Sequence, residues 1–318
     1  MSIAVVIPCY RVQKHILGVL EKIPDVVTHI YCVDDACPDK SGDLIEKDAK
    51  DKRIKILRHE ENQGVGGAMV TGYRAALEDK NQIIIKLDGD GQMDPRLIPQ
   101  FIAPIQSGEC DYAKGNRFYY IDNVKAMPPV RLFGNAVLSF MTKLSSGYWH
   151  LFDPTNGYTA VHANILKNMQ LSKLDKRYFF EIDILFRLNL LRANVQDIPM
   201  KAVYEDEESN LKIRKIIFPF ITKHIRNIFK RIVYNYFLRD FSVASVEIFL
   251  ALPLIIFGFL FGISKWIESS IEGVASSAGT VMLSALPILV GIQFLLSFLN
   301  FDIGNTPKTP IHQKLEQE

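Results

Sequence analysis

Two long apolar segments near the C-terminus constrain this chain more than any other feature. The segment Val243–Ile263 is apolar except for Glu247 near its start, and Thr280–Phe301 carries no charged side chain. Each is close to the roughly 20 residues that a helix needs to cross a bilayer, and neither shows the polar face of a soluble core helix. We therefore predict a transmembrane hairpin over residues 241–303, followed by a cytoplasmic tail over residues 304–318.

The stretch before the first apolar segment is basic and amphipathic. From Leu211 to Arg239 it contains eight Lys and Arg residues and no acidic residue. Its apolar residues recur at the spacing of a helix, which Pro219 is expected to break or kink. We predict that residues 211–240 lie on an anionic membrane surface. The chain opens with a short apolar run at Ile3–Ile7 instead of a secretory signal, which predicts a cytoplasmic N-terminus. Because the basic residues precede the first span, the positive-inside rule places both termini in the cytoplasm and the protein in the cytoplasmic membrane.

The first 210 residues alternate between strand-like and helix-like segments. The strand candidates are Ile3–Ile7, His29–Val33, Ile54–Arg58, Ile83–Leu87 and Asp111–Lys114. The helical patterns between them are Gln13–Lys22, Asp39–Asp48, Gly66–Leu77 and Pro95–Gln106. Near-continuous Val and Ile strands joined by helices predict a mostly parallel sheet that is covered on both faces. We expect an α/β domain over residues 1–210, which is long enough to bury its own core.

The composition of the chain and the residues after its first predicted strand argue against nucleic-acid binders, disulfide or zinc scaffolds and dinucleotide-dependent oxidoreductases. The chain carries 37 Lys+Arg and 35 Asp+Glu, a net charge of +2, so no nucleic-acid partner is expected. Its four cysteines are too few for a disulfide scaffold and lack the spacing of a zinc site, so reduced thiols are expected. The first strand is followed by Pro8-Cys9-Tyr10, where a dinucleotide-dependent oxidoreductase would have a glycine-rich turn.

Carboxylates follow the fourth predicted strand in the sequence Asp88-Gly-Asp90-Gly-Gln92-Met-Asp94-Pro95. While strand geometry persists, a spacing of two points Asp88 and Asp90 to the same side. Asp94 and Pro95 predict the N-cap and the first residue of a helix. Ligands of open α/β folds bind at the carboxyl ends of parallel strands, and carboxylates suit a hard divalent cation. A solvated Asp/Gly turn is the alternative, but the strand before it and the helix after it favour a functional site.

Taken in order, the motifs of this chain resemble the GT-A-fold glycosyltransferases of family 2. The resemblance is to the polyprenyl-phosphate sugar transferases, the group of dolichyl-phosphate mannose synthase and the bacterial bactoprenol glucosyltransferases. The matching motifs are Val5-Val-Ile-Pro8-Cys-Tyr10, Val33-Asp34-Asp35, Asn62-Gln-Gly64-Val-Gly66-Gly67-Ala68, Asp88-Gly-Asp90-Gly-Gln92 and Gly115-Asn116-Arg117. They cover nearly the whole region before the apolar segments, and two C-terminal spans occur in one branch of the group. The resemblance implies a GT-A, Rossmann-like fold.

The resemblance also implies roles for individual residues. The residues implied to bind Mg²⁺ or Mn²⁺ are Asp88, Asp90 and Gln92. The residues implied to hold the nucleotide-sugar are Pro8, Tyr10, Asp35, Gly64, Gly66 and Asp88. The residues implied to contact the lipid phosphate or the diphosphate are Arg117, Arg131 and Asn135. Asp153, in the sequence Phe152-Asp-Pro-Thr-Asn156-Gly157, and Asp90 are the implied catalytic residues, and Glu181 is a further candidate.

Some of these residues have simpler interpretations, and the chain departs from the family pattern at two places. Asp35 is also placed to cap the helix that follows it, and Arg117 is also compatible with a weak surface ion pair. Arg11 and Val12 stand where the family often has Asn-Glu, and residues 204–212 are acidic where a basic residue is frequent. These departures concern the donor base, the sugar and the contacts to the acceptor phosphate.

The reaction implied is the metal-dependent, inverting transfer of a hexose from a nucleotide-sugar, with UDP-glucose expected, to undecaprenyl or dolichyl phosphate at the cytoplasmic membrane face. GDP-mannose and UDP-N-acetylglucosamine are the alternative donors. Because a lipid phosphate is already ionised near neutral pH, Asp153 is as compatible with orienting a substrate as with removing a proton.

Two other classes of protein stay open. A processive polysaccharide synthase would share the acidic motif, but it usually has Gln-x-x-Arg-Trp, and neither Trp149 nor Trp266 lies in that context. A membrane scaffold without activity would not depend on Asp88 or Asp90. A homodimer or homotetramer is implied only by analogy.

Overall fold

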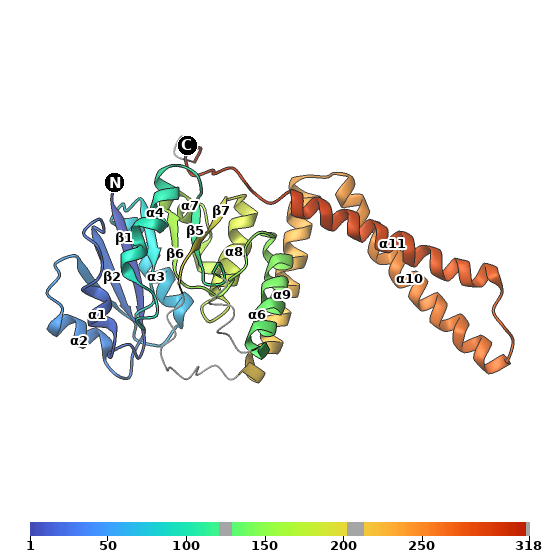
Figure 1. Ribbon diagram of the computed structural model, residues 1–318, viewed down its shortest axis with the longest axis horizontal. Coiled ribbons are helices and arrows are strands. Elements are labelled where there is room, and N and C mark those ends of the chain that lie inside the picture. The colour runs from blue at the N-terminus through green and yellow to red at the C-terminus, as the bar shows by residue number, and fades with distance from the viewer. Residues whose placement is uncertain (121–128, 202–212, 316–318) are drawn as a thin grey trace. The chain divides into compact units, whose positions relative to one another are not determined.

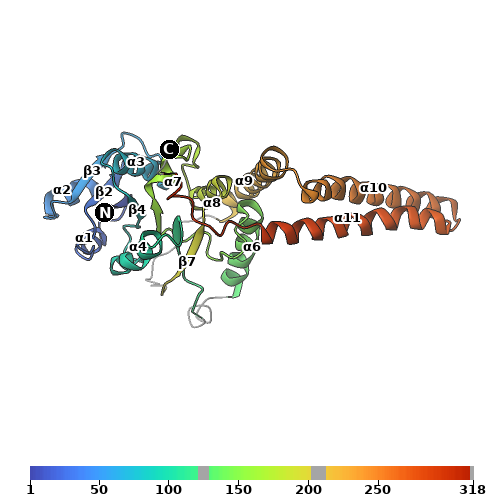
Figure 2. The same ribbon diagram turned by 90° about the horizontal axis from the view of Figure 1, so that it is seen from above.

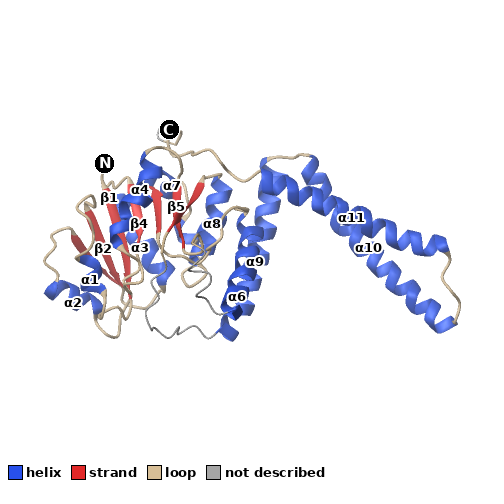
Figure 3. Cartoon of the chain, in the orientation of Figure 1, coloured by secondary structure: helices blue, strands red, loops and turns tan. Residues whose placement is uncertain are grey.

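The computed structural model describes residues 1–120, 129–201 and 213–315. The chain divides into two compact units. The larger unit contains Met1–Ile228 and Pro307–Glu318, and the smaller unit contains Phe229–Thr306. Figure 3 shows that the larger unit carries both strands and helices, whereas the described part of the smaller unit is helical.

The larger unit is built on a sheet that has seven strands within the described residues, in the order β3-β2-β1-β4-β6-β5-β7 (Figure 1). The strands are β1 (Ile3–Cys9), β2 (His29–Asp34), β3 (Ile54–Arg58), β4 (Ile83–Lys86), β5 (Tyr112–Asn116), β6 (Thr159–His162) and β7 (Val195–Pro199). β6 runs antiparallel to its neighbours β4 and β5, and the other pairs are parallel. The carboxyl ends of β1, β2, β4 and β5 therefore meet at one edge of the sheet.

Helices cover both faces of this sheet. They are α1 (Ile16–Leu20), α2 (Ser41–Asp48), α3 (Val65–Glu78), η1 (Pro95–Leu97), α4 (Ile98–Gln106), α6 (Pro129–Ser146), α7 (Ala163–Lys167), η2 (Leu171–Lys173), α8 (Phe180–Leu191) and α9 (Ile213–Val233), which continues into the smaller unit. Figure 2 shows α1 and α4 on one side of the sheet and α3 and α7 on the other. The predicted α/β class with a mostly parallel sheet is confirmed.

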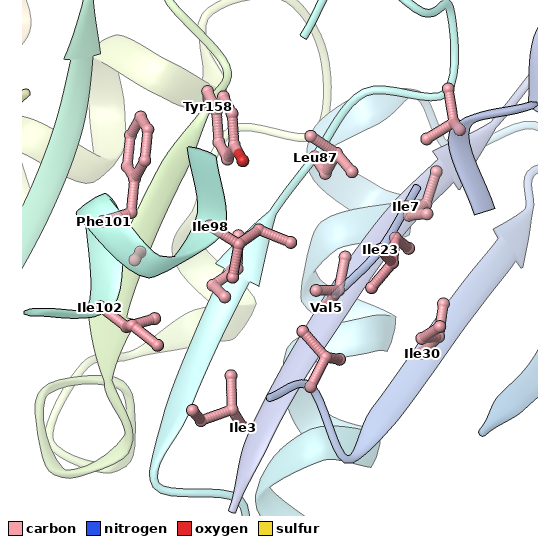
Figure 4. Close-up of a cluster of buried hydrophobic side chains, with 14 of the residues drawn as sticks. Ile3, Val5, Ile7, Ile23, Ile30, Leu87, Ile98, Phe101, Ile102 and Tyr158 are labelled. Atoms are coloured by element: carbon pink, nitrogen blue, oxygen red, sulfur yellow. The ribbon is translucent and has the colours of Figure 1, made fainter. Parts of the chain in front are cut away.

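Two hydrophobic cores lie on the two faces, because successive side chains of a strand point to opposite sides. Ile3, Val5 and Ile7 of β1 pack in the core under α1 and α4, whereas Ala4 and Val6 pack in the core under α3 and α8. Figure 4 shows the first of these cores, with the ring of Phe101 from α4 beside the ring of Tyr158. These two rings stack with their centroids 4.0 Å apart.

The structure confirms the five predicted strands and adds two that the sequence analysis missed. β6 has only four residues and ends at His162, and β7 contains Asp197 and ends at Pro199, so neither shows a long apolar run. The predicted helix start is also confirmed, since the Asp94 carboxylate accepts a hydrogen bond from the backbone N–H of Arg96 at 3.0 Å.

The predicted break at Pro219 is wrong, because α9 is one helix that continues through this residue. A proline inside a helix removes one backbone hydrogen bond, and a helix of 21 residues can keep its remaining bonds and side-chain packing. The irregular turn lies further on, at η3 (Tyr234–Arg239), which is a π-helical segment.

The smaller unit contains α10 (Val243–Glu272) and α11 (Ala278–Gly304). In the described part of the chain, these are the two helices that are long and apolar enough to cross a membrane. Only 17% and 11% of their most apolar stretches are buried, which differs from the core helix of a soluble protein. The two helices approach closely at glycines, since a Cβ on Gly258 would lie 2.7 Å from the carbonyl oxygen of Ser284.

A buried ion pair connects the two ends of the smaller unit. Arg231, near the end of α9, donates to Asp302 of α11, with Nη1 to Oδ1 at 2.6 Å and Nη2 to Oδ2 at 2.9 Å. The hydroxyl of Tyr236 donates to the same Oδ1 at 2.6 Å. Such a bidentate pair fixes both position and orientation, so it joins the end of α9 to the end of α11.

After α11 the chain packs against the larger unit again. Nδ1 of His312 lies 2.8 Å from Oδ1 of Asp111, and the backbone N–H groups of Ile311 and His312 donate to the same carboxylate at 2.8–3.0 Å. The ring of His312 stacks on that of His162, with the centroids 4.4 Å apart. Asp111 is fully buried and also accepts the backbone N–H of Asn194 at 2.7 Å. The tail is therefore part of the folded larger unit.

We expect Asp111→Ala to lower the free energy of unfolding by about 2–4 kcal/mol, because the N–H groups of Asn194, Ile311 and His312 lose a fully buried acceptor. Thermal or urea unfolding of the detergent-solubilised protein measures this change. Glu109→Ala, which alters an exposed carboxylate two positions away, is the control and should change the stability by less than about 0.5 kcal/mol. Equal stabilities of the two variants would contradict the docking of the tail on Asp111.

Candidate functional site

The acidic loop after β4 is the centre of the candidate site. Asp88 and Asp90 follow the strand directly, and Oδ1 of Asp90 accepts a hydrogen bond from the backbone N–H of Gln92 at 3.0 Å. The side chain of Asp88 is 29% exposed, and its Oδ1 lies 2.6 Å from Nζ of Lys86. The structure thus places the predicted metal residues together at the carboxyl edge of the sheet.

The ammonium group of Lys86 is shared by two carboxylates. Its side chain is 1% exposed, and Nζ also lies 3.3 Å from Oε1 of Glu181, in the first turn of α8. Burial opposes the charge on Lys86, but Asp88 and Glu181 together raise its pKa above the ordinary value. Burial also raises the pKa of Glu181, although Lys86 partly offsets this effect. The sequence analysis proposed Glu181 and missed Lys86, whose signal was a single lysine in an otherwise apolar strand.

A second turn of the chain approaches Asp88 so closely that a side chain larger than that of glycine would displace the charged groups there. A Cβ on Gly157 would lie 2.6 Å from Oδ2 of Asp88 and would collide with Nζ of Lys86. The preceding residue, Asn156, donates from Nδ2 to Oδ2 of Asp153 at 3.2 Å. The turn Asp153–Gly157 therefore joins the acidic loop to the next group of charged residues.

That group is an ion pair between two of the predicted site residues, Arg117 and Asp153. The arginine donates to the carboxylate from Nε at 2.8 Å, from Nη2 at 2.9 Å and from its backbone N–H at 3.1 Å. Asp153 is buried, which opposes its charge, but Arg117 and Lys114 hold its pKa below the ordinary value. The partner of Arg117 is thus a buried carboxylate, and the alternative of a surface ion pair is wrong. Asp153 is placed to orient Arg117.

Helix α6 carries the other two predicted phosphate-binding residues. Arg131 lies in its first turn and Asn135 is half-buried one turn later. The hydroxyl of Ser139 donates to the carbonyl oxygen of Phe152 at 2.9 Å, so α6 lies beside the residue that precedes Asp153. The side chain of Arg131, like the acidic stretch 204–212, lies outside what the structure describes.

Asp35 organises a loop on the other half of the sheet edge. Its two carboxylate oxygens accept four hydrogen bonds at 2.7–2.9 Å, from His59 Nδ1, Asn62 Nδ2, Gln63 N and Gly64 N. The following helix is instead held by Asp34, whose Oδ2 accepts the backbone N–H of Gly42 at 2.8 Å. The alternative of Asp35 as a helix cap is therefore wrong. Its role in nucleotide binding stays a prediction.

The loop that Asp35 holds contains two glycines, Gly64 and Gly66, at positions where the backbone leaves no room for a side chain. Gly64 has φ of +84°, in the left-handed region, and a Cβ there would lie 2.6 Å from the carbonyl oxygen of Lys176. A Cβ on Gly66 would collide with the carbonyl oxygen of Asp175. Pro8 and the exposed Tyr10 follow on the neighbouring strand, next to Asp35. Five of the six residues predicted to hold the nucleotide-sugar thus lie around one part of the edge, and the sixth, Asp88, lies in the acidic loop. The segment 175–177 connects the glycine loop to α8.

The acidic loop fits a cation that takes most of its ligands from elsewhere. Asp88, Asp90 and Gln92 carry the oxygen ligands that Mg²⁺ and Mn²⁺ accept, but they supply fewer than the six that such ions require. Within residues 1–120, 129–201 and 213–315, no cluster of three or more His, Cys, Asp and Glu side chains is placed to hold a metal ion. The remaining ligands would come from water and phosphate oxygens.

Comparisons with known proteins agree with this arrangement. The family model described as Glycosyl transferase family 2 matches residues 4–169, just over half of the chain. The UDP-N-acetylglucosamine–dolichyl-phosphate N-acetylglucosaminyltransferase of Methanococcus voltae is 29% identical over 218 residues, which cover 64% of this chain and 86% of that protein. The undecaprenyl-phosphate mannosyltransferase of Micrococcus luteus is 27% identical over 207 residues, which cover 64% and 84%.

A solved structure shows a similar fold. Glucosyl-3-phosphoglycerate synthase from Mycobacterium tuberculosis, in complex with Mn²⁺, UDP-glucose and phosphoglyceric acid, has a TM-score of 0.55 and 15% sequence identity. The alignment covers 76% of this chain and 88% of that one. At this identity the likeness concerns the fold.

We expect Asp153→Asn to lower the free energy of unfolding at pH 7 by about 3 kcal/mol, because Arg117 loses a buried counter-charge. The pKa of Asp153 is lowered in the folded state, so its stabilising effect is complete above the ordinary carboxyl pKa of about 4 and is lost as pH falls through the lower folded value. Urea unfolding at pH 7, 5 and 3.5 measures the difference, with the exposed Asp25→Asn as the control. A difference that has already vanished at pH 5 would contradict this.

Proposed function

Because the chain belongs to glycosyl transferase family 2 and has the GT-A fold, we propose that this glycosyltransferase moves a hexose from a nucleotide-sugar to a polyprenyl phosphate at a membrane surface. Family membership accounts for the sugar transfer. The observation that supports a lipid as the acceptor is an exposed apolar surface next to the Arg117–Asp153 pair.

This surface begins on α6. Phe133 and Phe140 are 72% and 55% exposed, and Val137 lies between them on the same side of the helix. α9 lies beside α6 in Figures 1 and 2, and Oγ of Ser145 is 2.8 Å from Nδ1 of His224. The exposed apolar residues of α9 in the larger unit are Ile217, Phe218, Ile221 and Ile225. Apolar patches of this kind are typical of membrane contact, and α6 also carries Arg131 and Asn135.

The charges at the sheet edge are suited to sugar transfer. A divalent cation bound at Asp88 and Asp90 would neutralise the charge that develops on the leaving diphosphate. Arg117, which Asp153 holds in one orientation, adds a fixed positive charge beside the same loop. The acceptor phosphate is already ionised, so the reaction needs in-line positioning more than a general base. The low pKa and the hydrogen bonds of Asp153 support a positioning role, and a single displacement inverts the anomeric carbon.

The donor is a nucleotide-activated hexose. UDP-glucose is the donor that the sequence analysis predicts. The names of similar proteins support N-acetylglucosamine and mannose as further candidates, the latter also in the dolichol-phosphate mannosyltransferase of Pyrococcus furiosus, which is 24% identical over 236 residues. The assay therefore uses UDP-glucose, UDP-N-acetylglucosamine and GDP-mannose.

Two features support a membrane-anchored enzyme with both termini on one side. The helices α10 and α11 are long and apolar enough to cross a membrane, and they form a hairpin in sequence. The chain before Phe229 and the chain after Thr306 belong to the same folded unit, and the tail docks there on Asp111. A hairpin that starts and ends at one unit crosses the membrane an even number of times. The basic residues before α10 support the cytoplasm as that side.

The proposed reaction is tested with the detergent-purified full-length protein, Mn²⁺, undecaprenyl or dolichyl phosphate, and each of the three radiolabelled donors. We expect one donor to transfer its label into the lipid extract. If no donor labels the lipid while the protein remains folded, the proposed function is wrong.

We expect Asp88→Asn and Asp90→Asn each to reduce transfer at least about 100-fold, because the diphosphate then lacks its bound counter-charge. Transfer of label into the lipid measures the effect. Asp94→Asn is the matched control, since Asp94 lies in the same loop but pairs with the exposed Arg96. A loss of the same size in the control would show that general damage to the loop, and not the metal ligands, is responsible.

We expect the double variant Phe133→Ser, Phe140→Ser to raise the KM for undecaprenyl phosphate about 5- to 10-fold, because each exposed aromatic ring loses apolar contact with lipid. Transfer to the short-chain geranyl phosphate should change little, since its tail covers less of the surface. Val26→Ser, at another exposed apolar residue, is the control. Equal losses with the long and the short acceptor would contradict a lipid-binding role for α6.

A further inference from the structure

The buried Lys86 has a position that cation binding alone does not explain, because it places a positive charge against a carboxylate proposed to hold a cation. We propose that Lys86, held from its other side by Glu181, makes binding of a divalent cation at Asp88 conditional on the donor diphosphate. Lys86 and Glu181 then act as positioning residues that couple the cation to the donor. This inference rests on the proposed function, since it takes Asp88 and Asp90 as the residues that bind the cation.

The ammonium group of Lys86 is fixed in place. Lys86 is the last residue of β4, and its backbone lies between Val6 of β1 and Thr159 of β6. Its Nζ lies 2.6 Å from Oδ1 of Asp88 and 3.3 Å from Oε1 of Glu181. Gly157 closes over Nζ so tightly that even a Cβ would collide with it. A cation that approaches Asp88 therefore meets the positive charge of Lys86, which two carboxylates hold and Gly157 covers.

This positive charge weakens the binding of a cation on its own. Oδ1 of Asp88 is already engaged by Lys86, and Oδ1 of Asp90 already accepts the N–H of Gln92. Two like charges a few ångströms apart repel each other, and partial burial strengthens this repulsion. A diphosphate brings both negative charge and oxygen ligands, so it offsets the ammonium group and completes the coordination of the cation. The cation and the nucleotide should therefore bind together.

Glu181 has the opposite effect on the cation. Its carboxylate shares the ammonium group, so it takes part of the positive charge that would otherwise act on Asp88 alone. Removing the charge of Lys86 should strengthen the binding of the cation without nucleotide, whereas removing the charge of Glu181 should weaken it. Glu181 also lies in the first turn of α8, four residues after the segment 175–177 that packs on Gly64 and Gly66 of the predicted nucleotide loop. The pair thus lies between the two parts of the site.

The test is a titration of the purified full-length protein with Mn²⁺, followed by the electron paramagnetic resonance signal of the unbound ion, without nucleotide and with UDP or GDP. For the wild type we expect one of the nucleotides to raise the affinity for Mn²⁺ at least about tenfold. Lys86→Met should raise the affinity without nucleotide about tenfold and so reduce the nucleotide effect. Glu181→Gln should lower the affinity without nucleotide several-fold. Lys14→Met, at an exposed lysine before α1, is the control and should stay within about twofold.

Three results would overturn the inference. Equal Mn²⁺ affinity of the wild type with and without nucleotide would show that the two do not bind together. A decrease in both Lys86→Met and Glu181→Gln would show that the pair only maintains the fold. Thermal unfolding shows whether Lys86→Met folds. If it does not fold, an unchanged Mn²⁺ affinity of Glu181→Gln without nucleotide would overturn the inference.

The same titration separates this inference from the proposed function. Absence of Mn²⁺ binding by the wild type under all conditions would overturn the shared assignment of Asp88 and Asp90. The proposed function itself fails only if no donor labels the lipid, which the transfer assay shows without any titration. Lipid labelling together with equal Mn²⁺ affinities would leave the function standing and remove the inference.

Discussion

The strands β1, β2, β4 and β5 point in the same direction, although the antiparallel β6 lies between β4 and β5. Their carboxyl ends therefore meet at one edge of the sheet, and the candidate site depends on this constraint. Asp35, Asp88 and Arg117 each follow a different one of these strands. They are far apart in the sequence, so no local structure could bring them together. The loops between the strands then complete the site, because they pack against one another through Gly64, Gly66 and Gly157.

The charged side chains at this edge of the sheet, and those buried beneath it, contact side chains of opposite charge. These contacts determine which charged groups are held in place for the proposed substrates. Lys86 lies between Asp88 and Glu181, and Asp153 lies against Arg117. A buried charge without a partner would cost several kcal/mol, so these pairs are needed for the fold whatever the chemistry. They also hold the half-buried members, Asp88 and Arg117, in one orientation. The same contacts therefore serve stability and the positioning of the proposed substrates.

The location of the proposed acceptor follows from a different property of the chain, its distribution of apolar surface. A polyprenyl chain does not leave the bilayer, so an enzyme that uses it must bring its active site to the headgroups. The exposed apolar residues of α6 and α9 and the two long apolar helices are suited to such contacts. The hydrogen bonds of His312 to Asp111 hold the chain that follows α11 on the larger unit.

The sequence by itself determined the α/β class, five of the strands, the acidic loop and the two apolar helices. These features follow from local patterns: runs of Val and Ile, helical periodicity, and carboxylates that come directly after the predicted strand Ile83–Leu87. It also indicated which residues belong to the site, through motifs that resemble a known family. It did not reveal the short strands β6 and β7, because their few residues carry little periodic signal, and it placed a break at Pro219 that packing and the remaining hydrogen bonds overrule.

Only the tertiary structure decided which charged groups meet. That Glu181 shares the ammonium group of Lys86, that Asp153 orients Arg117, and that Asp35 holds its loop with both oxygens are contacts between residues 24 to 95 positions apart. That His312 returns to Asp111 spans 201 positions. No local pattern encodes such pairings, because they depend on how the strands are ordered in the sheet and on which loops that order brings side by side.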